Sequence, residues 1–286
     1  MDKIIEQMLT QHETVTLADK KNSIKEIMQE IVLCGLSRAG FFKSAAFYGG
    51  TALRIFYGIE RFSEDLDFSL AAPDPDFDFG AYLPTLEKEV RSYGLNFRVE
   101  PKAKTADSDV KSAFLKGSTR EHMLIFYADE QTAKAIGGNE VVKVKFEVDI
   151  NPPEFAGFER KYRLLPIPYE ITLYDMPSLF AGKIHAVICR GWKNRVKGRD
   201  LYDFVFFRKN RTQVNLPHLT ARLAQTGNIA AGAQPALADI KKMLCGRFDS
   251  IDYGQAKADV LPFIKNPAEI EIWSADFFKG ITIDML

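Results

Sequence analysis

The stretch that decides the fold of this chain is YGGTALRIFYGIERFSEDLDF, residues 48–68. It opens on a glycine pair, Gly49 and Gly50, followed by Thr51 and a short segment with helical spacing. Glycine lets a bound group approach the backbone closely, and free N–H groups at the start of a helix attract anions. The opening therefore predicts a cradle for phosphate groups that uses backbone N–H groups and the Thr51 hydroxyl. Arg54, one helical turn later, either neutralises phosphate charge or pairs with an acidic neighbour.

The end of the same stretch carries two carboxylates. If residues 62–70 form a strand, side chains two positions apart share a face, so Ser63, Asp65 and Asp67 point one way and the apolar residues between them point into a core. Carboxylates about 6–7 Å apart repel each other unless a cation lies between them. Mg²⁺, bound by one or two carboxylates plus substrate phosphates, is the usual solution. We therefore expect a metal site at Asp65 and Asp67, with Ser63 either contacting a phosphate or satisfying the strand edge.

Further along the chain, two more segments join this pattern. Residues 141–150, VVKVKFEVDI, alternate strictly enough to predict a strand whose polar face carries Glu147 and Asp149. Residues 177–190 predict a helix, since Pro177 suits a first helical turn and the apolar residues that follow have helical spacing.

Together the pieces GGTALR…RFSEDLDFSL, KVKFEVDI and AGKIHAVICR…KGRDLYD resemble the AbiEii/AbiGii abortive-infection toxin family, to which the MenT toxins are related. The glycine turn, short helix and D-x-D strand look like the first motif of the DNA polymerase β-type nucleotidyltransferase superfamily. The resemblance runs from about Phe41 to Phe207. It implies a mixed α/β fold, with a polymerase-β-like nucleotidyltransferase core, N-terminal helices and a C-terminal helical lobe.

The resemblance also implies roles for individual residues. In polymerase-β-like enzymes a third carboxylate comes from a strand beside the D-x-D strand, and here both Glu147 and Asp149 have the right parity. The resemblance places Lys183 in the nucleotide cleft, where its compact charge contacts a phosphate. Asp200 matches the R-D of KGRDLYD and orients Lys183, Arg199 or a metal-bound water. Asp203 shares its helix face and is the alternative.

A basic segment is the best candidate for an RNA contact. The segment 190–199, RGWKNRVKGR, supplies positive charge for a phosphate track and an indole that can stack on a base. The residues are Arg190, Trp192, Lys193, Arg195, Lys197 and Arg199, and Arg208, Lys209 and Arg211 follow them. A solvated basic loop is the alternative interpretation.

The composition is that of a soluble globular protein, with 46% hydrophobic and 27% charged residues. Lys+Arg and Asp+Glu balance at 38 each, so any contact with a polynucleotide must use a local patch. Three distant cysteines without a C-x-x-C pair argue against a disulfide framework or a zinc site and fit a reducing cytoplasm. The N-terminus MDKIIEQMLTQHE has acidic and polar breaks, so we expect no signal peptide, and no apolar run reaches transmembrane length.

The domain organisation follows from the same patterns. We expect N-terminal helices over 1–40, the nucleotidyltransferase core over 41–175 and a C-terminal helical lobe over 176–286 that shares the active cleft. Within the core, residues 95–100 and 121–128 alternate well enough to predict strands, and the polar stretch 101–119 predicts a loop or hairpin end.

The resemblance implies a toxin of a type IV toxin–antitoxin or abortive-infection system that acts in phage defence. It would transfer nucleotides from an NTP to an acceptor with Mg²⁺ or Mn²⁺, the 3′ end of tRNA being the acceptor in related toxins, and its antitoxin would be encoded nearby. Protein nucleotidylation or phosphoryl transfer at the same site is a second interpretation. A non-enzymatic NTP-binding module is a third, although two metal-binding aspartates argue against a pure binder.

Overall fold

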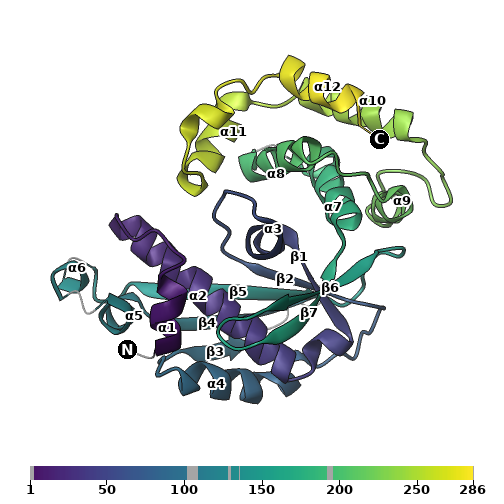
Figure 1. Ribbon diagram of the computed structural model, residues 1–286. Coiled ribbons are helices and arrows are strands. Elements are labelled where there is room, and N and C mark those ends of the chain that lie inside the picture. Colours follow the sequence, from purple (N-terminus) through teal and green to yellow (C-terminus); the bar gives the residue numbers. More distant parts are fainter. Residues whose placement is uncertain (1–2, 102–108, 128–129, 135, 192–195, 286) are drawn as a thin grey trace. The chain divides into compact units, whose positions relative to one another are not determined.

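The computed structural model describes residues 3–101, 109–127, 130–134, 136–191 and 196–285, and its fold is mixed α/β, as predicted (Figure 1). The centre is a seven-stranded mixed sheet in the order β3-β4-β5-β2-β1-β7-β6. The strands are β1 Ala45–Tyr48, β2 Leu66–Leu70, β3 Arg98–Pro101, β4 Val110–Ser118, β5 Val141–Asp149, β6 Phe158–Arg163 and β7 Tyr169–Tyr174. Strand β1 pairs antiparallel with β2 and parallel with β7, while β2 pairs parallel with β5.

The chain forms two compact units. The first consists of Met1–Thr51, Glu64–Pro152 and Arg160–Leu173, and the second consists of Ala52–Ser63, Pro153–Glu159 and Tyr174–Leu286. The helices of the first unit are α1 Lys3–Leu9, α2 Leu17–Arg38, α4 Leu83–Ser92, α5 Thr119–Tyr127 and α6 Glu130–Lys134, and α3 Gly49–Tyr57 begins in this unit. The helices of the second unit are α7 Met176–Cys189, α8 Gly198–Lys209, α9 Leu216–Gln225, α10 Leu237–Phe248, α11 Tyr253–Val260 and α12 Ala275–Ile283. None of the helices in the described part of the chain is long and apolar enough to cross a membrane.

The long helix α2 confirms the helical prediction for residues 1–40. It begins after Thr16, whose hydroxyl accepts from the N–H of Asp19 while the Asp19 carboxylate accepts from the N–H of Thr16. This capping box satisfies two backbone donors that the first turn of a helix leaves unpaired. The helix packs against β5, α4 and α5, which explains why most of its second half is buried.

Between residues 101 and 128 one prediction is wrong and another is only partly right. The expected strand at 121–128 falls on helix α5, which ends at Tyr127, and residue 128 lies outside the described residues. The buried side chains of His122 and Phe126 lie one helical turn apart, which is a helical spacing. The expected loop 101–119 contains strand β4, while its residues 102–108 lie outside the described residues. Strand β4 pairs antiparallel with β5 over its full length, and this tertiary pairing overrides the polar character of the isolated segment.

An aromatic cluster forms the core beneath the first unit's sheet. Phe41 lies at its centre and is fully buried. Its ring centroid lies 5.0 to 6.2 Å from those of Phe42, Phe68, Phe77, Phe79 and Tyr82, in edge-to-face arrangements. Such contacts stabilise aromatic pairs beyond their buried area. Phe68 belongs to β2, so the cluster also fixes the strand that follows the first carboxylate.

We predict that Phe41→Ala lowers the free energy of unfolding by about 3–5 kcal/mol, because the substitution leaves a cavity surrounded by rings that cannot all move in. Chemical denaturation followed by far-ultraviolet circular dichroism measures this. Phe42→Ala is the matched control, since Phe42 is only half-buried and should cost clearly less. Equal losses in the two variants would contradict the central position of Phe41.

Candidate active site

The glycine turn packs directly against the second aspartate of the D-x-D pair. Strand β1 ends at Tyr48, whose partner on the antiparallel strand β2 is Asp67, and helix α3 starts at the next residue, Gly49. Gly49 has φ +83°, a left-handed conformation that side chains with a Cβ rarely adopt. A Cβ at this position would lie 2.5 Å from Oδ2 of Asp67. Glycine is thus required twice, by the backbone conformation and by the carboxylate that lies against it.

Thr51 fixes the first aspartate through the backbone. Its buried hydroxyl donates to the carbonyl oxygen of Asp65 at 2.5 Å, which ties the first turn of α3 to the residue before β2. The strand begins at Leu66 rather than at residue 62, so the prediction of a strand over 62–70 is correct only in its second half. The alternation survives, because Asp65 is exposed and Asp67 half-buried, while Leu66 between them is fully buried.

Helix α2 braces the same segment, which sequence reasoning missed. Gln29 is fully buried and donates from Nε2 to the carbonyl oxygen of Glu64 at 2.9 Å. Lys25, one turn earlier, places Nζ 2.8 Å from Oε1 of Glu64. The available signal was an uncharged polar residue inside an apolar helical stripe, since a buried amide must find hydrogen-bond partners. Two elements therefore hold the chain immediately before the carboxylate pair.

The register of the sheet distinguishes the two candidates for a third carboxylate. Strand β2 pairs parallel with β5, and Asp67 faces Glu147, whereas Asp149 faces Ser69. Paired residues on neighbouring strands point to the same face, so Glu147 is the direct neighbour of Asp67. Glu147 accepts from the Ser112 hydroxyl at 3.1 Å and lies 2.7 Å from Nζ of Lys145.

The carboxylates fit a particular mode of metal binding. Within the residues that the structure describes, no group of three or more His, Cys, Asp or Glu side chains is gathered closely enough to hold a metal ion. Mg²⁺ does not need such a cage, because it commonly binds through one or two carboxylates and completes its shell with water and substrate phosphates. The oxygen donors of Asp65 and Asp67 fit this mode, whereas they would not suit a softer metal.

The remaining phosphate candidates of the glycine stretch have varied environments. Gly50 is buried and Ser63 is 8% exposed. Arg54 belongs to the second unit and donates from Nη1 to the carbonyl oxygen of Ile59 at 3.2 Å, which closes the end of helix α3. This hydrogen bond has a structural role of its own, which requires neither an acidic partner nor a phosphate.

A buried ionic cluster in the second unit holds Lys183. Its Nζ lies 2.7 Å from Oδ2 of Asp203 and 3.1 Å from Oδ1 of Asp200. Asp203 also receives two hydrogen bonds from Arg61, one from Nε at 2.5 Å and one from Nη2 at 2.7 Å. Asp200 likewise has two cationic partners, Lys183 and Arg190, because Arg190 donates a hydrogen bond to its second carboxylate oxygen. Both aspartates of KGRDLYD thus contact Lys183, and the role expected of them at a nucleotide site stays a prediction.

Burial and neighbouring charges oppose each other in this cluster. Burial alone would raise the pKa of Asp203, but Arg61 and Lys183 outweigh it and hold that pKa below its usual value. Burial alone would lower the pKa of Lys183, and Asp203 and Asp200 together raise it instead. Each group is therefore charged at neutral pH because of the others. Removing one member leaves a buried charge without compensation.

The basic segment is only partly visible. Trp192, Lys193 and Arg195 lie outside the described residues. Arg190 is bound to Asp200, and Arg199 lies 4.2 Å from the centre of the Phe263 ring and 3.9 Å from Asp259. The half-buried Lys197 is the N-cap of α8. The described arginines thus have roles inside the second unit, and an RNA contact by this segment stays a prediction.

Comparison with known proteins was made on this basis. A model of the family described as nucleotidyl transferase AbiEii toxin, type IV TA system, matches residues 31–278. No curated protein gave a significant match. Among solved structures, JHP933 from Helicobacter pylori is 17% identical with a TM-score of 0.46, and the alignment covers 91% of this chain and 89% of that one. A candidate nucleotidyltransferase from H. pylori is 18% identical with a TM-score of 0.46, covering 90% of each chain.

We predict that Gly49→Ala destabilises the protein more than Gly58→Ala. Both glycines have positive φ, but a Cβ at Gly58 meets no atom within 4 Å, so that substitution adds only the backbone cost of about 1–2 kcal/mol. Gly49→Ala must also displace the Asp67 carboxylate, which adds about 1–3 kcal/mol. Denaturant unfolding of both variants and of Gly49→Ala/Asp67→Ala measures the difference. If the added Asp67→Ala relieves none of the loss, the carboxylate is not what requires glycine.

We predict that Asp203→Asn removes a pH-dependent part of the stability. Because the pKa of Asp203 is lower in the folded protein than its unfolded value of about 3.9, its charge stabilises the fold above that pH. This contribution is lost as the pH falls through the folded-state pKa. The stability difference between parent and variant should therefore shrink below about pH 4, measured by denaturant titrations from pH 7 to pH 3. Asp249→Asn, in an exposed pair with Lys279, is the control and should show little such change.

Proposed function

The chain belongs to the AbiEii nucleotidyl transferase toxin family, and from this premise we propose that it transfers a nucleotide from an NTP to the 3′ end of tRNA, using Mg²⁺ or Mn²⁺. It acts in the cytoplasm as the toxin of a type IV toxin–antitoxin system in phage defence, with an antitoxin encoded nearby. The observation that carries the proposal is the packing of the Asp67 carboxylate on Gly49 at the start of helix α3.

Each residue of this arrangement has a proposed task. The backbone N–H groups of Gly49 and Gly50 bind the triphosphate, whose charge the helix start favours. The buried Thr51 hydroxyl donates its hydrogen to the carbonyl oxygen of Asp65, so its role is to hold the turn rather than to bind phosphate. Asp65 and Asp67 hold the metal ion. When bound, it neutralises the phosphates and makes the α-phosphorus more electrophilic. The proximity of Gly49 and Asp67 sets how closely the triphosphate lies to these carboxylates.

We assign the third carboxylate to Glu147, because the register places it beside Asp67. Its task is to accept the proton of the attacking hydroxyl, for which a carboxylate on the same sheet face is suitably placed. Lys145 and Ser112 hold its carboxylate in position. Asp149 lies at the end of β5 and accepts from the N–H of Asn151 at 3.0 Å, which gives it a turn-forming role.

For Lys183 we propose a phosphate contact. An ammonium group has three N–H donors, and Asp200 and Asp203 account for two of them, so the third remains for a phosphate oxygen. Asp200 positions the lysine and Asp203 holds its charge in place. The proposed RNA contacts are Arg190, Trp192, Lys193, Arg195, Lys197 and Arg199.

The position of a radioactive label separates the proposed reaction from its alternatives. Purified protein is incubated with each of the four NTPs, total RNA and Mg²⁺. Label from the α-phosphate appearing in small RNA supports the proposal. The same label in protein would indicate protein nucleotidylation, and label only from the γ-phosphate would indicate phosphoryl transfer. NTP binding without any transfer would indicate a regulatory module.

We predict that Asp65→Ala or Asp67→Ala reduces transfer at least a thousandfold, because the two carboxylates bind the metal on which the phosphoryl chemistry depends. The fold should remain, since removing one of two neighbouring negative charges relieves repulsion. Transfer of labelled nucleotide and thermal unfolding are measured in parallel. Asp76→Ala, in an exposed loop of the same unit, is the control. Near-normal transfer in either site variant would reject the metal assignment.

A further inference from the structure

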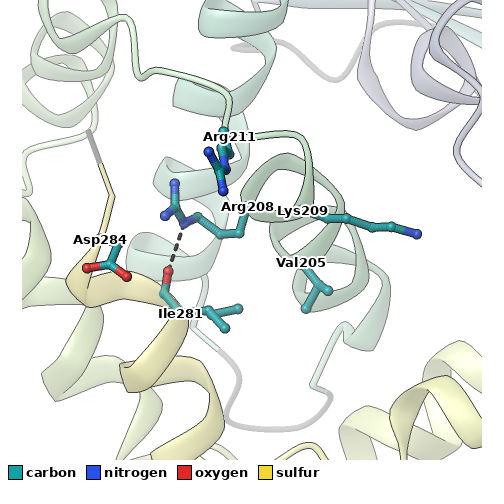
Figure 2. A pocket seen from close by; sticks show the side chains of 6 residues that line it. All are labelled: Val205, Arg208, Lys209, Arg211, Ile281 and Asp284. Atoms are coloured by element: carbon teal, nitrogen blue, oxygen red, sulfur yellow. Dashed lines mark hydrogen bonds between the residues drawn. The ribbon is translucent and has the colours of Figure 1, made fainter.

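The C-terminal end of helix α8 borders a cavity of about 680 Å³ in the second unit (Figure 2). Its lining comes from the last turns of α8, the residues after it, and the end of α12. The lining residues are Val205, Arg208, Lys209, Arg211, Ile281 and Asp284. Three side chains are cationic and one is anionic, so the cavity has an excess of positive charge. Its volume lies within the range of small-ligand sites.

Arg208 and Arg211 both line this cavity. Lys209 extends away from them (Figure 2). Arg208 donates from Nε to the carbonyl oxygen of Ile281 at 2.8 Å, and burial lowers its pKa despite the attraction of Asp284. Within the described part of the chain, neither arginine has a carboxylate within 4.0 Å. Cationic side chains that line one cavity favour an anionic ligand there.

The backbone of Arg211 supplies an independent observation. It has φ +50°, in the left-handed region that glycine or asparagine normally occupies after a helix. The N–H of Arg211 donates to the carbonyl oxygen of Arg208, and the N–H of Thr212 to that of Phe207, which together form a Schellman motif. An arginine here is locally unfavourable because of its Cβ. A strained residue at a cavity wall is a reason to look for a function of its side chain.

We propose that this cavity binds the phosphate group of a small phosphate ester of mononucleotide size. The planar fork of a guanidinium donates two parallel hydrogen bonds to phosphate, and two such forks can grip one tetrahedral anion. Val205 and Ile281 provide apolar surface for the organic part of the ligand. Carbonyl groups at the end of α8 would repel an anion, but the Schellman motif engages those of Phe207 and Arg208. The site uses none of the residues assigned to nucleotidyl transfer and does not depend on that assignment.

The experiment is a calorimetric titration of the full-length protein with AMP and with inorganic phosphate, in EDTA so that no divalent metal contributes. Arg211→Gly removes the guanidinium while giving the Schellman motif its preferred residue. We expect its affinity for both ligands to fall at least tenfold while its Tm stays equal to or above that of the parent. Arg211→Lys keeps the charge but loses the planar guanidinium. Its affinity for both ligands should therefore lie between those of the parent and of Arg211→Gly. Lys242→Ala, on the exposed part of α10, is the matched control and should bind as the parent does.

Three outcomes would overturn the proposal. The first is an absence of binding by the parent protein at millimolar AMP and phosphate. The second is unchanged affinity in Arg211→Gly, which would show that any binding occurs elsewhere. The third is binding of a single-stranded oligonucleotide more than tenfold tighter than AMP with the same dependence on Arg211. That result would reject the small ester in favour of a polynucleotide backbone.

Discussion

The contact between the Asp67 carboxylate and the backbone of Gly49 is the constraint on which the candidate site depends. It exists because β1 and β2 pair antiparallel with Tyr48 opposite Asp67, so the residue after β1 must pass beneath that carboxylate. Only a residue without a Cβ can do so, and its left-handed conformation then starts helix α3. One packing requirement thus determines the turn, the helix start and the position of the Asp67 carboxylate.

The buried carboxylate of Asp203 holds two cationic side chains together in the second unit. Asp203 compensates Arg61 and Lys183, which come from a loop and a helix far apart in the sequence. A buried ion pair is weak support for stability by comparison with apolar packing, but losing one partner is severe. Because the loss of one partner is so costly, Arg61, Lys183 and Asp203 stay in contact. These contacts fix the orientation of Lys183. A lysine that only needed solvation would instead extend its ammonium to the surface.

The parts of the fold that the sequence could predict are those encoded locally. The Gly49-Gly50 turn, the alternation of β5 and the caps of α2 each depend on neighbours within a few residues. Apart from helix α5, whose helical spacing is local, the errors and omissions depend on distant partners. Strand β4 is recognisable only through its pairing with β5, and the choice of Glu147 over Asp149 requires the register of two strands about eighty residues apart. No local pattern indicates such a partner.

The charged residues of helix α8 are arranged by sign along its length. Its acidic residues Asp200 and Asp203 lie near its N-terminus, and Arg208 and Lys209 lie in its last turn, which is the order that the helix dipole favours. The positive charge at its end therefore has a sufficient structural explanation. That explanation does not extend to Arg211. A glycine would end the helix at a lower conformational free energy, because a Cβ is unfavourable in the left-handed backbone conformation. The case for a ligand rests on this one residue and on Arg208, which lines the same cavity, so a substitution at Arg211 that relaxes the backbone can test it.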